Sequence, residues 1–116
     1  MSYMIKISLL LNIFVLAPVC YGLLSKASWV DVSYGSATAA RGILLSVYIA
    51  ILLSSILLFF KADPKFVAAL LFAQVIYKLT TPFTVGTVTN SVVISNLFIA
   101  FFHTVTLFII WKEGHI

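Results

Sequence analysis

Charged residues are so sparse and so clustered in this chain that long apolar segments separate them. Seven Lys and Arg and three Asp and Glu residues are present among 116. The gaps between their clusters are long enough for the roughly 20 apolar residues that a transmembrane helix needs. A soluble domain carries about a quarter charged residues, whereas this chain carries 9% and has a mean hydropathy of +1.20. The chain is therefore predicted to be an integral membrane protein.

Four apolar segments are predicted to cross the membrane, at about 7–25, 42–60, 66–83 and 92–111. They read as helices because they are continuously apolar, whereas the strands of a membrane barrel alternate polar and apolar residues. The remaining residues are too few for a separate soluble domain. The predicted fold is all-α: one transmembrane domain over residues 1–116, folded as an antiparallel up-down-up-down four-helix bundle.

The N-terminal segment has two interpretations. Lys6, the apolar run after it and the sequence LAPVC resemble a lipoprotein signal that ends at Cys20. Such a signal prefers a small residue before the cysteine, and here that residue is Val19. We therefore expect a first membrane helix with a kink near Pro18, which a bundle tolerates. Cys20 is the only cysteine, so an intramolecular disulfide is excluded.

Basic residues near the spans predict the orientation of the chain. With both termini on one side, that side carries Lys6, Lys61, Lys65 and Lys112, and the opposite side carries Lys26, Arg41 and Lys78. Cytoplasmic loops carry an excess of Lys and Arg, so we expect both termini in the cytoplasm and the 26–41 connection outside. Trp29 and Tyr34 in this connection suit an aromatic belt, and a short half-helix on the interface is the alternative.

Polar residues in the last two spans fall at matching heights. These spans are joined by a short loop and should be antiparallel neighbours. Lys78 and Asn96 lie at similar distances from that loop, which predicts a first contact between them. Gln74 lies one turn from Lys78, and His103 lies two turns from Asn96 on the same face, which predicts a second contact near mid-membrane.

Two interpretations of these polar residues remain open. In the first, they form interhelical hydrogen bonds that fix helix register. In the second, they form a ligand site, because an ionisable residue in a membrane is a candidate site. The stem of Lys78 is long enough to reach the interface. Alternatively, Lys78, Arg41 and Tyr77 ring one mouth, which would suit an anion, a lipid headgroup or a quinone carbonyl. The candidate ligand-binding residues are Lys78, Arg41, Asn96, Gln74, His103 and Tyr77.

Histidine and acidic residues bear on cofactors and catalysis. A mid-membrane histidine can bind haem, relay protons or donate to a quinone. Haem is not expected, because a second strong ligand is missing and His115 lies in the terminal tail. We expect a neutral His103 bonded to Gln74 or to a threonine of its own span.

The acids all lie outside the spans, so no paired carboxylates, metal cluster or catalytic set is predicted. Small multidrug transporters need a glutamate in the first span, where this chain has Asn12.

Late in the first span the chain has APVCYG, and the second span is entered through YGSATAARGILLSVYIAI, which contains Arg41 and Gly42. With the long connection between them, these segments resemble the DoxX-like group of small four-helix bacterial membrane proteins. The resemblance implies a location in the bacterial inner membrane. A few members of that group are similar to, or partnered with, membrane subunits that pass electrons from sulfur compounds to quinone. The segment TTPFTVGTVTN matches no motif of that group.

Small residues and the polar pairs lead to two predicted functions. Ser46, Ala50, Ser54, Ser55, Ala68, Ala69 and Ala73 are spaced for close helix packing, within one bundle or between protomers. The first function is a non-catalytic accessory or interaction subunit, in a homo-oligomer or a larger membrane complex. The alternative is a small binding or transport protein whose anionic or quinone-like ligand enters from the outer face between the last two spans. No resident cofactor and no nucleic-acid partner are predicted.

Overall fold

Four long helices and one short helix make up the described part of the chain. The structure is a computed structural model that describes residues 3–116, and those residues contain no strand. The helices are α1 (Tyr3–Ser25), α2 (Ser28–Tyr34), α3 (Ala39–Phe60), α4 (Pro64–Val85) and α5 (Ser91–Lys112). The all-α fold is confirmed. Each long helix contains one predicted span and begins one to four residues before it.

Helix starts lie ahead of the apolar runs because polar caps fix them. The Thr38 side chain accepts a hydrogen bond from the Arg41 backbone N–H at the start of α3. Asp63 accepts from the Lys65 N–H, with Pro64 as the first residue of α4. Such caps satisfy backbone donors that a helix leaves free at its N-terminus. Gly86, with φ of 87°, ends α4 in a left-handed conformation that glycine adopts without strain.

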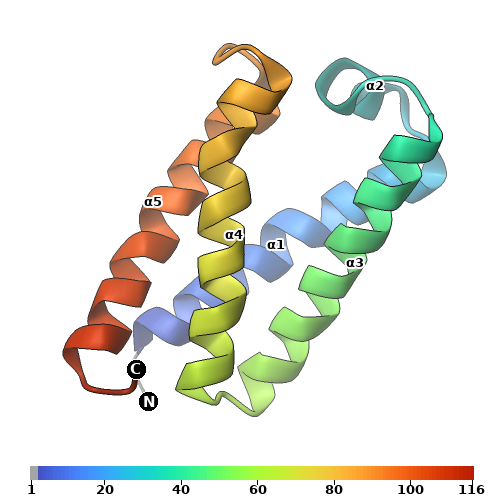
Figure 1. Cartoon of the computed structure of the whole chain (residues 1–116). Helices are drawn as coiled ribbons and strands as arrows, with labels where there is room; N and C mark the ends of the chain where they lie inside the picture. Colours follow the sequence, from blue (N-terminus) through green and yellow to red (C-terminus); the bar gives the residue numbers. More distant parts are fainter. Residues whose placement is uncertain (1–2) are drawn as a thin grey trace.

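The long helices form two antiparallel pairs (Figure 1). One pair is α1 with α3, and the other is α4 with α5. The start of α1, the C-terminal residues and the 61–63 connection lie at one end, here called the terminal end. The opposite end, called the loop end, carries α2 and the 86–90 connection. Although α3 and α4 are consecutive, they diverge toward the loop end. The chain therefore runs up, down, up and down, as predicted.

The interior consists of two apolar clusters with polar residues between them. The terminal-end cluster contains Ile5, Leu9, Val67, Ala68, Leu71 and Ile110. The loop-end cluster contains Leu16, Cys20, Leu23, Val30, Tyr48 and Ile51. Along α1, the buried Asn12 lies between Leu9 of the first cluster and Leu16 of the second, and the buried Ser8 lies one turn before it. The middle of the bundle is therefore held by hydrogen bonds rather than by apolar packing.

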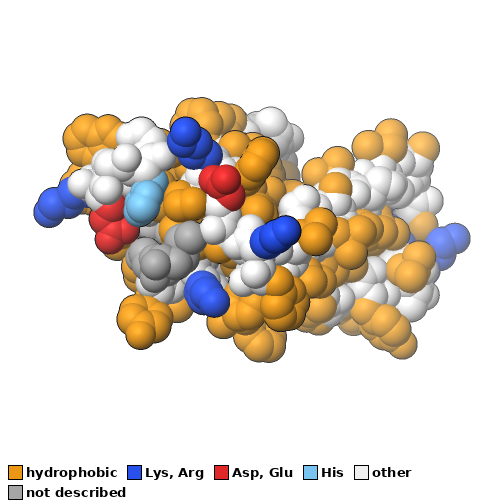
Figure 2. All heavy atoms as spheres, turned by 90° about the horizontal axis from the view of Figure 1, so that it is seen from below, with side chains coloured by type: hydrophobic (Ala, Val, Ile, Leu, Met, Phe, Trp, Pro, Cys, Tyr) orange, Lys and Arg blue, Asp and Glu red, His pale blue; other side chains and the backbone are white. Residues whose placement is uncertain are grey.

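The surface of the bundle is suited to lipid. All four long helices are long and apolar enough to cross a membrane. Large hydrophobic side chains such as Phe14, Leu57 and Phe98 are exposed on their flanks. Seen from the terminal end, basic and acidic side chains gather on that end and hydrophobic side chains surround them (Figure 2). The protein is a small multi-pass membrane protein.

The connection between α1 and α3 contains the short helix α2, as in the half-helix interpretation. Its position on the interface and the aromatic belt stay predictions. The Trp29 ring of α2 lies against Gly22, where an added Cβ would come within 2.2 Å of the indole. The Ser33 hydroxyl lies 2.9 Å from that of Ser91, and Asn90 Nδ2 donates to the Ser33 carbonyl at 3.1 Å. Contacts with α1 and α5 therefore hold α2 across the gap between the two helix pairs.

Candidate functional site

Lys78 and Asn96 form the predicted contact between α4 and α5. Lys78 Nζ donates to Asn96 Oδ1 at 3.0 Å, and Asn96 Nδ2 donates to the Thr81 hydroxyl at 3.1 Å. Only 4% of the Lys78 surface is exposed. The interpretation that Lys78 extends to the membrane interface is therefore wrong. The side chain turns inward because Asn96 offers an acceptor at the same height on the neighbouring helix.

The Lys78 ammonium has no carboxylate partner among residues 3–116, which the structure describes. Asp31 pairs with Arg41, Asp63 caps α4, and Glu113 lies near His115 in the terminal tail. These are the three acids of the sequence. The ring of Tyr77, whose centroid is 5.0 Å from Nζ, contributes a cation–π contact. A buried positive charge with this little compensation is costly in a membrane.

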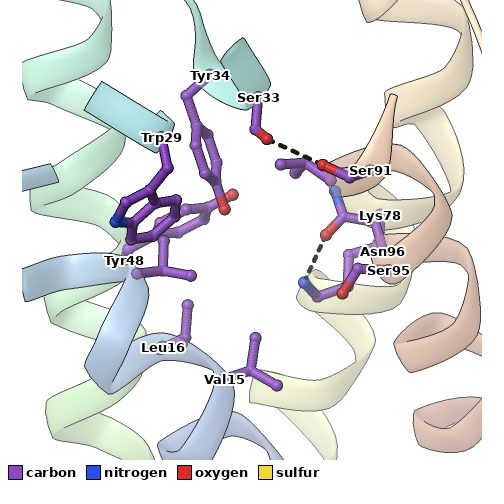
Figure 3. A pocket seen from close by; sticks show the side chains of 12 residues that line it. Val15, Leu16, Trp29, Ser33, Tyr34, Tyr48, Lys78, Ser91, Ser95 and Asn96 are labelled. Carbon is purple, nitrogen blue, oxygen red and sulfur yellow. Dashed lines mark hydrogen bonds between the residues drawn. The ribbon is translucent and has the colours of Figure 1, made fainter. Parts of the chain in front are cut away.

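A hollow of about 250 Å³ adjoins Lys78 and lies beneath α2 (Figure 3). Trp29, Tyr34 and Tyr48 form one wall, and Lys78 and Asn96 belong to the other. The remaining lining residues are Val15, Leu16, Val19, Ser33, Ser91, Val92 and Ser95. The hollow thus lies between the α4–α5 pair on one side and α1, α2 and α3 on the other. The predicted entry between α4 and α5 stays a prediction. Those two helices pack against each other and leave the Lys78 hollow on their inner side.

A larger hollow of about 690 Å³ shares part of this lining. Tyr34, Tyr48 and Asn96 contribute to both hollows. The larger one extends between α3 and α4, where Leu44 faces Tyr77 and a group of threonines, Thr80, Thr81 and Thr84. The two hollows therefore form one region with apolar, hydroxyl and amide groups and a single ammonium.

Three tyrosines give this region its donors. The rings of Tyr34 and Tyr48 pack edge to face with centroids 6.1 Å apart, and their hydroxyls point into the hollow (Figure 3). Burial raises the pKa of Tyr34 to about 12, so this phenol keeps its proton at neutral pH. The buried hydroxyl of Tyr77 makes no hydrogen bond within the described residues. The lining is therefore rich in donors and suits a ligand that brings acceptors.

Arg41 is not part of this region. Its guanidinium donates to the Asp31 carboxylate and, at 2.7 Å, to the Gly35 carbonyl. It is buried and lines a separate hollow of about 220 Å³ that also involves Lys26. The predicted mouth with two cations is therefore wrong, because Asp31 neutralises Arg41 and draws it to the end of α2. Arg41 instead fixes α2 to α3.

Gln74 and His103 are both bonded to Asn12. Asn12 Nδ2 donates to Gln74 Oε1 at 2.7 Å and to Ser55 Oγ at 3.1 Å. Asn12 Oδ1 accepts from Gln74 Nε2 at 3.1 Å and lies 2.8 Å from His103 Nε2. The predicted second contact is therefore bridged rather than direct, because α1 inserts its amide between α4 and α5. All four bonding positions of the Asn12 amide are used.

The partners of His103 define its protonation pattern. An amide oxygen only accepts, so His103 Nε2 carries the hydrogen that points to Asn12. Nδ1 lies 3.2 Å from the Ser8 hydroxyl, which in turn lies 2.6 Å from the Thr106 hydroxyl. In a neutral ring Nδ1 accepts, so the Ser8 hydroxyl donates to it. The one hydrogen of the Thr106 hydroxyl is directed either to Ser8 or, at 3.3 Å, to the Phe102 carbonyl. The expected partners, Gln74 or a threonine of α5, are replaced by Asn12 and Ser8 of α1.

Residues of the first two spans were missing from the predicted set. Asn12, Ser8 and Ser55 join the polar layer, and Tyr48 faces Lys78 across the hollow. Ser8 and Asn12 are spaced four residues apart, which places them on one helix face. This spacing was the available signal. No pattern in the sequence indicates which helix that face meets.

The geometry defines a small multi-pass membrane protein with a polar mid-membrane layer and, nearer the loop end, a hollow that contains a buried lysine. No family model, curated protein or solved structure matches the chain. The likeness to the DoxX-like group therefore stays a prediction.

Proposed function

We propose that the protein is a small membrane binding protein whose hollow beneath α2 receives an anionic or quinone-like ligand at Lys78. The observation that carries this proposal is the buried Lys78 ammonium, which lines the hollow and faces no carboxylate. An anion or a carbonyl oxygen would supply a further acceptor beside Asn96 Oδ1. Asn96 holds the Lys78 ammonium in place through one N–H group. The other N–H groups of the ammonium are available to a ligand.

The surroundings of Lys78 support binding rather than catalysis. The walls combine aromatic and aliphatic side chains with a few convergent donors, which is the usual composition of a small-molecule site. Trp29 and Tyr48 provide flat apolar surface, and the Tyr77 hydroxyl makes no hydrogen bond in the part of the chain that the structure describes. Gln74 and His103 belong to the polar layer below and support the helices that position Lys78.

Native mass spectrometry of the protein extracted with its own lipids tests this proposal. The wild-type protein is expected to retain a small molecule, and Lys78→Met is expected to lose it while the bundle stays folded. Lys26→Met is the matched control, because Lys26 lies at the same end and is exposed. Equal retention by all three proteins would show that Lys78 receives no ligand.

A second candidate is an accessory or interaction subunit of a homo-oligomer or larger membrane complex. Exposed small residues favour it: Ser46 and Ala50 on α3, and Ala69 and Ala73 on α4. Small residues at fourfold spacing let helices of different chains approach closely. The same spectra report stoichiometry and partner chains. A monomer without partners would count against this role.

The location of the protein follows from the same reasoning. We propose the bacterial inner membrane, with both termini in the cytoplasm, as the excess of Lys at the terminal end favours. We also propose membership of the DoxX-like group, with a quinone as the ligand. The carbonyl oxygens of a quinone would accept hydrogen bonds from the donors that line the hollow. Labelling of single introduced cysteines from either side of the membrane, in a Cys20→Ser background, tests the orientation.

A further inference from the structure

The line between α3 and α4, here called the α3–α4 seam, contains two hollows. The first is the 690 Å³ hollow at the loop end, between Tyr48 of α3 and Tyr77 of α4. The second has a volume of about 280 Å³ and lies nearer the terminal end. Its lining residues are Ser54, Leu57, Leu58, Phe66 and Leu70. Both hollows exist because α3 packs against α1 and α4 packs against α5, so these consecutive helices diverge (Figure 1).

The chemistry of the seam changes along its length. At the loop end it has the hydroxyls of tyrosines and threonines, and Asn96, which holds Lys78, belongs to its lining. At the terminal end Ser54 is the only polar side chain among the lining residues of the second hollow. Exposed hydrophobic residues such as Leu57 and Phe66 place this second hollow against lipid. The seam is thus polar at the loop end, where it shares Asn96 with the smaller hollow that Lys78 lines, and apolar at the other end.

From this gradient we infer that the ligand is a single-chain anionic amphiphile of the fatty-acid class, which enters sideways from the bilayer. This inference rests on the proposed function. The carboxylate binds Lys78, for which it supplies the missing negative charge. The chain lies along the α3–α4 seam toward the second hollow. A single chain fits because the two hollows follow each other along one helix interface.

Photolabelling in bilayers tests where the chain lies. The probe is palmitic acid with a diazirine at mid-chain, added to the protein in nanodiscs of neutral lipid. After illumination, tandem mass spectrometry is expected to find label on Leu57, Leu58, Phe66 or Leu70. Unlabelled palmitate is expected to compete, whereas methyl palmitate, which has no charge, is not.

Two variants with a matched control separate the head from the chain. Lys78→Met is expected to reduce labelling at least tenfold. Ser54→Phe fills the second hollow and is expected to reduce it similarly without touching Lys78. Ile56→Phe places the same side chain at the depth of Ser54 on a flank of α3 that lines neither hollow, and is expected to leave labelling unchanged. Circular dichroism and size-exclusion chromatography establish that each variant is folded.

The outcomes distinguish this inference from the proposed function. The inference of an amphiphilic ligand would be overturned if the label spread evenly over lipid-facing side chains and did not change in Lys78→Met. If acetate or phosphate then still protected Lys78 from an amine-acylating reagent, the site would bind a water-soluble anion and the proposed function would stand. If neither probe depended on Lys78, both proposals would fall. Competition by methyl palmitate as strong as by palmitate would overturn the role of the carboxylate.

Discussion

Replacing Asn12 with leucine removes the side chain that makes most of the hydrogen bonds between the two helix pairs. Its amide makes four hydrogen bonds, two with Gln74 and one each with Ser55 and His103. At about 0.6 kcal/mol for an average hydrogen bond between membrane helices, their loss costs about 2.4 kcal/mol. The penalty exceeds this value if the stranded Gln74 and His103 find no other partners.

Reversible unfolding in bicelles measures this change in the free energy of unfolding. Phe14→Leu is the control, because Phe14 lies on the lipid-facing side of α1. In a double-mutant cycle, Asn12→Leu with Gln74→Leu should cost less than the two single changes together, by about 1.2 kcal/mol for the two shared hydrogen bonds. A loss below about 0.6 kcal/mol for Asn12→Leu, or full additivity in the cycle, would refute the role of Asn12 as the link.

Three further predictions concern α2 and the polar layer. Gly22→Ala should displace Trp29, because the new methyl group would overlap the indole, and a shift in the Trp29 fluorescence of a Trp111→Phe background would report it; an unchanged spectrum would contradict the contact. Asp31→Asn should free Arg41 and speed proteolysis of the α2 segment severalfold, whereas Asp63→Asn, at the other end, should not. Nitrogen NMR of a His115→Gln variant should show a neutral His103 ring with its hydrogen on Nε2, and a hydrogen on Nδ1 instead would refute the bond to Asn12.

The membrane class and the helix positions could be predicted because they follow from local composition. Apolar length sets each span, and the caps at Thr38, Asp63 and Asn90 account for the few residues by which the helices exceed it. The contact between Lys78 and Asn96 was also predictable, because a short loop fixes the relative height of α4 and α5. Here local sequence and tertiary structure agree.

The path of α1 and the direction of Arg41 could not be predicted in this way. That Gln74 and His103 lie at equal height does not specify which third helix inserts between them. The position of Asn12 between these two residues therefore cannot be predicted from the sequence. Arg41 was assigned to the Lys78 mouth from its position at the start of a span. Its actual partner, Asp31, lies ten residues earlier, and the short helix α2 brings the two together. Both errors arise from long-range packing. The apolar pattern of a membrane helix predicts where the helix lies in the sequence but not which other helices it contacts.

The layout of the hydrogen bonds has a consequence for synthesis of the chain. The partners of Asn12 lie 43, 62 and 91 residues further along, on three different helices. The first helix therefore enters the membrane with a side-chain amide that has no protein partner until later helices arrive. The hairpin of α4 and α5, by contrast, carries the Lys78 contact within itself. Assembly should thus end with the closing of one preformed hairpin onto a waiting amide, and cells that make the chain without its last two helices should degrade it quickly.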